Sequence, residues 1–305
     1  METRTLGRTG MQVTAIGYGS MELRGSRVWS GRPVDDGEAG RVLNEVLDQG
    51  INFIDTAYSY GEAEALIGRH IGHRRHEYML ATKCGREVID RGTHDETPHC
   101  WNRRFLTDSF DESLRRLNTD YVDLLQLHGP MPEDARSEEL VEWLHGLRQA
   151  GKVRWIGISS FLPAAPHFIE AGDFDTIQMP YSALERAHEY WIAEAAARGA
   201  GVIVRGGVGR GEPGAGLGQE DQWAWWDRAG LDELLAEGES RTSFMLRFTM
   251  SHPDVSTIIV GTKNPAHLRD NVAQAGRGAL PADVYEEAKR RLTAAGSVPE
   301  RTRTS

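Results

Sequence analysis

Several short apolar runs in this sequence are followed directly by a polar residue that could take part in acid–base chemistry. Asp55, Lys83 and His128 each end or follow such a run. Tyr60 lies five residues after Asp55, so both side chains can reach the same place. Later runs carry polar residues in the same way, at Ser159, Ser160 and Gln178. Because purely structural strands give no reason for this repetition, these residues are predicted to share one site.

The combination of a tyrosine with an aspartate, a lysine and a histidine indicates proton transfer to a substrate oxygen. A phenol has a reference pKa of about 10, and an adjacent ammonium lowers it by stabilising the phenolate. Lys83 is expected to supply that charge, Asp55 to keep Lys83 charged, and neutral His128 to donate a hydrogen bond to the substrate. Such a set suits carbonyl reduction, with Tyr60 as the acid. No side chain can supply the hydride, so a nicotinamide cofactor is implied.

A shared site requires elements that bring the ends of these runs together. Short β-branched runs alternate with amphipathic stretches along the chain, which is typical of a parallel sheet with crossover helices. Strands are predicted at residues 13–18, 52–55, 78–83, 122–127, 153–159, 176–180, 202–205 and 257–261, and helices at 37–48, 104–117, 138–149, 190–198 and 242–250. The count and order predict a (β/α)8 TIM barrel, in which the loops after the strands form the active site. A doubly wound sheet is disfavoured, because the first strand lacks a Gly-rich turn leading into a helix.

Three segments stand outside this repeat. Residues 4–13 contain Gly7 and Gly10 between two β-like runs, which predicts a hairpin that closes the barrel floor. The stretch 206–239 is rich in glycine and then in tryptophan, and it is interpreted as a long loop. The last residues are polar. We expect one barrel domain over residues 1–295 and a flexible tail over residues 296–305.

The composition excludes several classes of partner. The 305 residues include 35 Lys and Arg against 45 Asp and Glu, a formal net charge of −10. This balance argues against a broad nucleic-acid or anionic-membrane surface. No apolar stretch approaches a membrane span, and the first residues do not form a secretion signal. With only Cys84 and Cys100 present, a reducing, cytoplasmic location and a small-molecule substrate are expected. Oligomeric state is left open.

The sequence resembles the aldo-keto reductase family from Arg4 to about Ala273. The motifs that carry the resemblance are Gly50-Ile51-Asn52-Phe53-Ile54-Asp55-Thr56-Ala57 with Tyr60, then Ala81-Thr82-Lys83, then Ser113-Leu114-Arg115-Arg116-Leu117, and finally Asp120-Tyr121-Val122-Asp123-Leu124-Leu125-Gln126-Leu127-His128. Each is weak alone, but their order is specific. The resemblance implies a carbonyl reductase whose catalytic residues are Asp55, Tyr60, Lys83 and His128.

The resemblance also implies an extended NADP(H), less often NAD(H), across the barrel mouth. The matching cofactor positions are Gly19, Ser20, Met21, Asp55, Ser159, Ser160, Gln178, Arg205, Gly206, Gly207, Val208, Gly261, Thr262, Lys263, His267 and Asn271. Residues 261–265 are expected to open a helix whose free amides suit a phosphate. Three positions depart from the family pattern. Ser160 replaces the usual asparagine, His267 stands where many NADP-specific members have arginine, and Arg205 replaces the aromatic residue that stacks on nicotinamide.

Other interpretations of these residues remain open. Lys83 could form a Schiff base in an aldolase, and the chain could be a cofactor-sensing regulatory subunit. Metal binding is not expected, because neither His70, His73 and His76 nor the set of Cys84, His94, His99 and Cys100 has a regular ligand spacing. Five tryptophans are equally consistent with a substrate pocket and with core packing: Trp29, Trp101, Trp223, Trp225 and Trp226.

Overall fold

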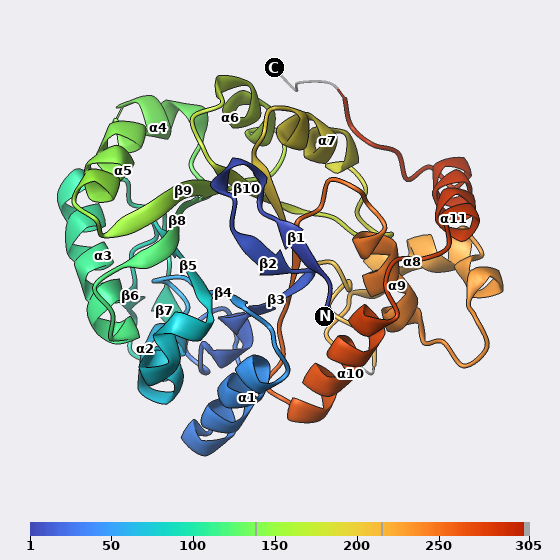
Figure 1. Cartoon of the computed structure of the whole chain (residues 1–305), viewed down its shortest axis with the longest axis horizontal. Coiled ribbons are helices and arrows are strands. Elements are labelled where there is room, and N and C mark those ends of the chain that lie inside the picture. Colours follow the sequence, from blue (N-terminus) through green and yellow to red (C-terminus); the bar gives the residue numbers. More distant parts are fainter. Residues whose placement is uncertain (138, 215, 302–305) are drawn as a thin grey trace.

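The computed structural model describes residues 1–137, 139–214 and 216–301, and in this part of the chain eight parallel strands close into a barrel (Figure 1). The strands, in barrel order, are β3 (Ile16–Gly19), β4 (Phe53–Asp55), β5 (Met79–Cys84), β8 (Val122–His128), β9 (Val153–Ser159), β10 (Thr176–Pro180), β11 (Gly201–Arg205) and β12 (Thr257–Val260). The predicted (β/α)8 TIM barrel is confirmed. Its β-branched runs are buried because helices cover the outside of a parallel barrel.

A helix follows each barrel strand in the described part of the chain. These helices are α1 (Asp36–Asp48), α2 (Ala63–Ile71), α3 (Arg103–Leu117), α5 (Leu140–Gln149), α6 (Ala165–Ala171), α7 (Glu189–Ala197), α9 (Arg241–Met250) and α10 (Pro265–Gly276). Side-chain caps set several starts. The Asp35 carboxylate accepts the N–H of Glu38 at the start of α1, and the Asn102 side chain accepts the N–H of Arg104 at the start of α3.

Two predicted boundaries were wrong. The run at 13–18 is divided, because Gln12–Thr14 forms hairpin strand β2 and only Ile16–Gly19 belongs to the barrel. The helix predicted at 138–149 begins at Leu140 in the described residues, and position 138 lies outside them. A separate short helix, α4 (Pro132–Ser137), precedes it.

The N-terminal hairpin closes the floor of the barrel, as predicted. Strand β1 (Thr3–Thr5) pairs antiparallel with β2, and the hairpin lies across the barrel end that faces the viewer in Figure 1. Between the strands, Gly7 has a φ of +49°, and a Cβ there would overlap the backbone nitrogen of Gly201. A small apolar core lies between the hairpin and the barrel strands, and it consists of Leu6, Val13, Phe53, Ala81, Leu124 and Ile203. The mouth of the barrel is therefore at the opposite end.

The long loop predicted at 206–239 contains a helix, α8 (Glu220–Arg228), within its described residues; position 215 lies outside them. Trp223 and Trp226 from this helix are buried, with ring centroids 5.7 Å apart. The Trp226 ring also packs edge-on against Phe244 of α9. These two tryptophans therefore belong to the core, because helix α8 packs this segment against α9 on the outside of the barrel. The sequence interpretation as an open loop was wrong for this part.

The last described segment of the chain packs against the barrel. Helix α11 (Ala282–Ala294) leads into a segment in which Ser297 is buried and its carbonyl accepts a hydrogen bond from Arg186 (3.0 Å). The N–H of Glu300 donates to the carbonyl of Ala187 (2.9 Å). Of the tail predicted at 296–305, residues 302–305 lie outside the described residues. The first part of this segment is held in place.

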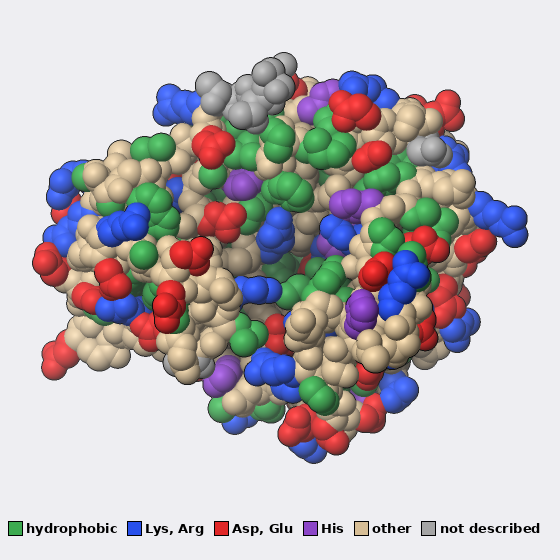
Figure 2. Space-filling view, turned by 180° about the vertical axis from the view of Figure 1, so that it is seen from behind, with side chains coloured by type: hydrophobic (Ala, Val, Ile, Leu, Met, Phe, Trp, Pro, Cys, Tyr) green, Lys and Arg blue, Asp and Glu red, His purple; other side chains and the backbone are tan. Residues whose placement is uncertain are grey.

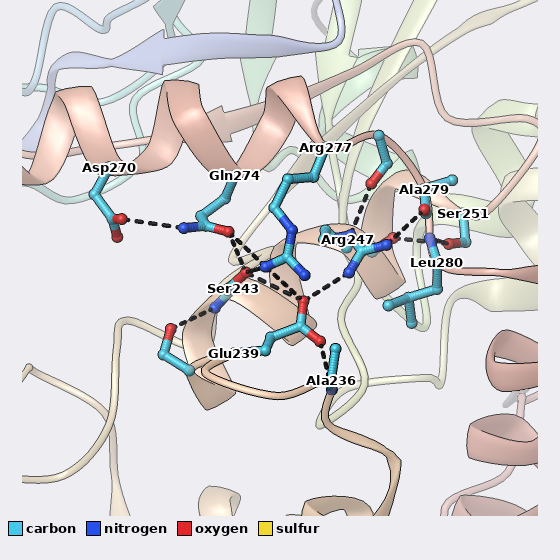
Figure 3. A network of polar contacts seen from close by, with 12 residues as sticks. Ala236, Glu239, Ser243, Arg247, Ser251, Asp270, Gln274, Arg277, Ala279 and Leu280 are labelled. Carbon is cyan, nitrogen blue, oxygen red and sulfur yellow. Dashed lines mark hydrogen bonds and ion pairs between the residues drawn. The ribbon is translucent and has the colours of Figure 1, made fainter.

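A buried polar network joins α9 to α10 (Figure 3). The carboxylate of Glu239 lies at its centre, with a side chain that is 1% exposed, and it accepts a hydrogen bond from Arg247 (2.7 Å). Arg277 approaches the same carboxylate at 3.2 Å, and the Ser243 hydroxyl donates to Gln274 (2.6 Å). The network joins Ser243 and Arg247 of α9 to Gln274 of α10. It therefore helps to fix the position of α10, whose first turn faces the barrel mouth.

Candidate active site

The mouth of the barrel is the face turned away in Figure 1 and toward the viewer in Figure 2. Figure 2 shows this face hollowed near its centre, with Lys, Arg and apolar side chains around the hollow. Parallel pairing aligns the strand ends: Lys83 is in register with Gln126, and His128 with Ser159. Asp55 pairs with Ala81, two residues before Lys83. The register therefore places the predicted strand-end residues in adjoining layers of one site.

Asp55 and Lys83 form a buried ion pair. The Lys83 ammonium donates to Asp55 Oδ2 at 2.5 Å and to the carbonyl of Thr56 at 2.9 Å, and its side chain is 1% exposed. The same ammonium lies 5.1 Å from the ring centroid of Tyr60. Burial by itself would lower the pKa of Lys83, but the charge of Asp55 and the hydroxyl of Tyr60 outweigh it and raise that pKa. Lys83 is therefore a fixed positive charge beside the phenol.

Two buried amides complete the surroundings of Asp55. Gln178 Nε2 and Gln126 Nε2 donate to Asp55 Oδ1 at 2.9 and 3.1 Å, and the Ser159 hydroxyl donates to Gln178 Oε1 at 3.0 Å. Sequence reasoning assigned Gln178 to the cofactor and gave Gln126 no role. The available signal was an amide in the otherwise apolar run 124–127. Both carboxylate oxygens have partners, so the orientation of Asp55 is fixed.

Tyr60 reaches the site from the turn after β4. Its N–H donates to the carbonyl of Ala57 (3.0 Å), and its own carbonyl accepts the N–H of Ala63. The next residue, Gly61, has a φ of +46°, and a Cβ there would overlap the carbonyl of Arg24. Only glycine meets both conditions without strain. This turn places the Tyr60 ring over Lys83 with 8% of the residue exposed.

His128 lies next to Tyr60 at the end of β8. The two rings meet edge to face with centroids 5.9 Å apart. Burial, then the charges of Lys83, Arg86 and Arg205, lower the pKa of His128 well below its usual value. The imidazole is therefore neutral near pH 7, and Nδ1 has no partner among the described residues. A neutral imidazole can donate a hydrogen bond to a substrate oxygen without giving up a full proton.

Residues predicted to bind the cofactor line the same mouth. The hydroxyls of Ser20 and Ser160 are buried and have no partner in the described part of the chain. At the adjoining ends of β3 and β12, a Cβ at Gly261 would lie 2.9 Å from the carbonyl of Gly19. Buried hydroxyls of this kind are normally satisfied, so they fit the amide and hydroxyl groups of a bound nucleotide.

Arg205 and the following residues border the mouth from β11. Arg205 is half-buried, and its charge contributes to the low pKa of both His128 and His188. Gly206 has a φ of +73°, and a Cβ there would meet no atom within 4 Å. In contrast, a Cβ at Gly207 would lie 2.5 Å from Ile258. The backbone at Gly206 is thus open to a ligand, whereas Gly207 is required by packing.

The first turn of α10 forms the outer part of the predicted cofactor site. Asn264 caps it by accepting the N–H of Ala266 (2.9 Å). Lys263 donates to the carbonyl of Pro33, in the loop after the neighbouring strand β3 (2.7 Å). His267 is exposed and Asn271 is partly buried on the same helix. The free amides expected there are mostly used or absent, because Pro265 has no N–H and the N–H groups of Asn264 and Ala266 donate to Thr262 Oγ1 and Asn264 Oδ1. This end therefore offers the positive end of the helix dipole, one ammonium and an exposed imidazole to an anion.

The five tryptophans whose role the sequence left open differ in their surroundings. Trp29 is 41% exposed and packs edge-on against Tyr60, with centroids 5.8 Å apart. Trp101 stacks on His99, whose Nε2 contacts the carbonyl of His128 at 3.1 Å. Trp29 and Trp101 border the candidate site, and Trp101, 8% exposed, also belongs to the main core together with Trp223 and Trp226. Trp225 is partly buried and packs against that core. Within the described residues, no three His, Cys, Asp or Glu side chains are grouped to hold a metal, and no helix is long and apolar enough to cross a bilayer.

His188, beside Arg205, is expected to make stability depend on pH. It is 5% exposed, its Nε2 accepts the N–H of Leu162, and burial followed by the charge of Arg205 lowers its pKa to about 4. Between pH 7 and 5 the unfolded state binds a proton that the folded state does not, so this residue lowers the free energy of unfolding by about 2 kcal/mol. In His188→Gln the total loss over this range is expected to be smaller by about that amount.

Denaturant unfolding of both proteins at pH 7 and pH 5 measures this difference. Groups such as Glu64, whose pKa is raised to about 7 by burial, act in both proteins and cancel in the comparison. Equal losses in the two proteins would contradict a neutral His188 in the folded state.

The sequence model described as "Aldo/keto reductase family" matches residues 15–291. The oxidoreductase YqkF of Bacillus subtilis is 28% identical over 90% of this chain and 91% of its own length. L-galactose dehydrogenase of Arabidopsis thaliana is 28% identical over 90% of this chain and 88% of its own. The holo form of aldo-keto reductase AKR11C1 from Bacillus halodurans superposes with a TM-score of 0.85 and 28% identity, covering 100% of both chains.

Proposed function

Because the chain belongs to the aldo/keto reductase family of NAD(P)H-dependent oxidoreductases, we propose that it reversibly reduces an aldehyde or ketone with NADP(H) and uses Tyr60 as general acid and base. The observation that carries this proposal is the position of the Tyr60 ring, 5.1 Å from the Lys83 ammonium and next to His128. An oxygen that gains negative charge is stabilised by a proton donor, a nearby positive charge and a hydrogen-bond donor, and the phenol, the fixed cation and the neutral imidazole provide these.

The cofactor proposal rests on the residues at the mouth. Bound nicotinamide would supply the hydride that no side chain of the chain can provide. Ser20, Ser160 and the open backbone at Gly206 are proposed to hold its nicotinamide half. The first turn of α10 with Lys263 would hold the phosphate end. The similar aldo-keto reductase AKR11C1 was solved in a holo form, which supports a bound cofactor in this chain as well. Lys263 favours NADP(H) over NAD(H), because the extra phosphate requires a cation.

The chain's own residues would move one proton. In reduction, the Tyr60 hydroxyl gives its proton to the oxygen of the former carbonyl, and Lys83 stabilises the phenolate left behind. His128 stays neutral and donates a hydrogen bond to the same oxygen, which orients the carbonyl. Asp55 holds Lys83, and Gln126 and Gln178 hold Asp55. In alcohol oxidation the same groups act in reverse, with phenolate as the base.

A Schiff-base aldolase is less well supported. Such a lysine must be a neutral amine that can reach the substrate carbonyl. The Lys83 ammonium is bonded to Asp55 and Thr56, its side chain is 1% exposed, and its pKa is raised by the charge of Asp55 despite burial. A charged, bonded lysine is a poor nucleophile. We therefore keep Lys83 as the cation that stabilises the Tyr60 phenolate.

We propose a cytoplasmic location, and this proposal rests only on the two free cysteines, Cys84 and Cys100.

A carbonyl panel tests the proposed function. Aldehydes and ketones are offered with NADPH and NADH in parallel, and cofactor oxidation is followed by absorbance. We expect turnover of at least one aldehyde, with kcat/KM higher for NADPH than for NADH because Lys263 and the positive end of the α10 dipole favour the extra phosphate. Tight NADPH binding without oxidation of any carbonyl would instead favour a regulatory, cofactor-sensing role. A covalent adduct trapped by borohydride would favour the aldolase.

A further inference from the structure

Arg86, in the loop after β5, has unused hydrogen-bonding capacity beside the candidate active site. It is half-buried, and Nη1 donates to the carbonyl of Thr97 at 2.9 Å. Its Nε is buried and has no partner, and no carboxylate forms an ion pair with Arg86 among the described residues. Burial lowers its pKa, which is the sign of a guanidinium that lacks a nearby anion.

Two other arginines, Arg27 in the loop after β3 and Arg91 in the same loop as Arg86, are paired with carboxylates. Arg27 forms ion pairs with Asp90 and Asp95, and Arg91 pairs with Glu96 at 2.9 Å. The protein as a whole has a formal net charge of −10, so carboxylates are plentiful. Burial of an unpaired cation costs free energy unless an anion pairs with it. Arg86 is therefore a place where an anion from outside the chain would be stabilised.

Contacts connect Arg86 to the reacting groups. Its guanidinium carbon lies 6.0 Å from the ring centroid of Trp29, and Trp29 packs against Tyr60. Through a backbone bridge Arg86 pairs with His99, which contacts the carbonyl of His128 at 3.1 Å. Arg86 thus lies on the wall that borders the proposed proton donor and the proposed carbonyl-orienting residue.

The barrel order separates this wall from the proposed phosphate end of the cofactor, whereas Ser20 after β3 and Ser160 after β9 lie nearer to it. Strand β5, which leads to Arg86, lies across the barrel from β11, which leads to Arg205 and Gly206. In the same way β8 lies across from β12, which leads to the phosphate-binding turn of α10. Because the charged phosphate end of the cofactor is proposed to lie at α10, an anion at Arg86 is assigned to the substrate.

We propose that Arg86 binds an anionic group, a carboxylate or a phosphate, on a carbonyl substrate whose body lies against the exposed ring of Trp29. The inference rests on the proposed carbonyl reduction and names its substrate class. A guanidinium suits both anions, because its planar N–H groups can bind two oxygens at once.

Matched substrate pairs test this inference. One pair is 4-carboxybenzaldehyde and its methyl ester, and the other is glyceraldehyde 3-phosphate and glyceraldehyde. The readout is the ratio of kcat/KM for the anionic member over the neutral member. We expect a ratio above one for at least one pair, and a fall of at least about 10-fold in Arg86→Gln, mainly through KM. The pair that responds tells carboxylate from phosphate.

Two further variants serve as controls. Arg91→Gln removes the same charge from the same loop and should leave the ratio unchanged, because Arg91 is exposed and already paired. Arg86→Lys keeps a charge and should retain part of the preference. If Arg86→Gln does not fold, the wild-type protein still decides the matter, because a real anion preference must weaken as ionic strength rises.

The outcomes separate this inference from the proposed function. Reduction of neutral and anionic aldehydes with equal kcat/KM would overturn the role of Arg86 and leave carbonyl reduction intact. A rise in KM for NADPH in Arg86→Gln, without a change in the substrate ratio, would also overturn it. If no carbonyl is reduced, calorimetric titration of benzoate into the NADP⁺-saturated protein still applies. Binding that is lost in Arg86→Gln but not in Arg91→Gln would support the anion site while the proposed reaction fails.

Discussion

Replacement of Tyr60 by phenylalanine is expected to lower kcat about 10²- to 10⁴-fold, the range that a positioned general acid contributes. The change removes one hydroxyl and keeps the ring that packs against Trp29 and His128. Binding of NADPH, measured by fluorescence titration, should remain close to the wild-type value, because the proposed cofactor residues are untouched. The measurement is kcat at saturating NADPH for an aldehyde that the wild-type protein reduces.

Tyr58→Phe provides the matched control. Tyr58 lies two residues earlier in the same turn, and its ring contacts Arg116 (4.7 Å) and Phe105 and not the catalytic candidates. Its loss of a hydroxyl should leave kcat within a few-fold of wild type. If Tyr60→Phe retained most of the wild-type kcat, the proton donor would have to be another group, and the role given to Tyr60 would be wrong.

Replacement of Lys83 by methionine is expected to affect both stability and activity. It leaves the Asp55 carboxylate buried without its cation, which typically costs about 3–5 kcal/mol of unfolding free energy. The positive charge 5.1 Å from the Tyr60 ring centroid is also lost, so kcat should fall by at least about 100-fold. Denaturant unfolding and steady-state kinetics measure the two effects separately.

The double variant Lys83→Met with Asp55→Asn separates these two roles. It removes both charges, so no buried carboxylate is left unpaired and much of the lost stability should return. The phenol still lacks its cation, so activity should stay low. Recovery of activity together with stability would show that Lys83 acts only in folding.

The residues of the candidate site could be predicted because strand ends are easy to locate. Asp55, Lys83 and His128 each stand at the end of a predicted strand, and in a parallel barrel all such ends meet at one face. The structure places them together, with Tyr60 reaching in from the turn after β4. The eight strands were found for the same reason, since each is a short β-branched run between amphipathic stretches.

Other features depend on tertiary contacts that no local pattern contains. Gln126 looked like part of an apolar strand, and only the register of β5 and β8 turns its amide toward Asp55. Helix α2 was missed because Gly68 interrupts its pattern, although a Cβ there would overlap the carbonyl of Arg116 in α3. Arg86 was not singled out, because its distinguishing feature is that no carboxylate pairs with it among the described residues. Whether an arginine forms an ion pair depends on tertiary contacts and cannot be predicted from the local sequence.

The central claim is that this barrel transfers a hydride to a carbonyl carbon while Tyr60 supplies the proton. The most direct measurement is the deuterium content of the alcohol formed from an unlabelled aldehyde with NADPH deuterated at the reactive C4 position, for wild type and Tyr60→Phe in parallel. We expect the wild-type alcohol to carry one deuterium on the former carbonyl carbon, and alcohol formation by Tyr60→Phe to fall about 10²- to 10⁴-fold. An alcohol without deuterium, or equal rates for the two proteins, would contradict the claim.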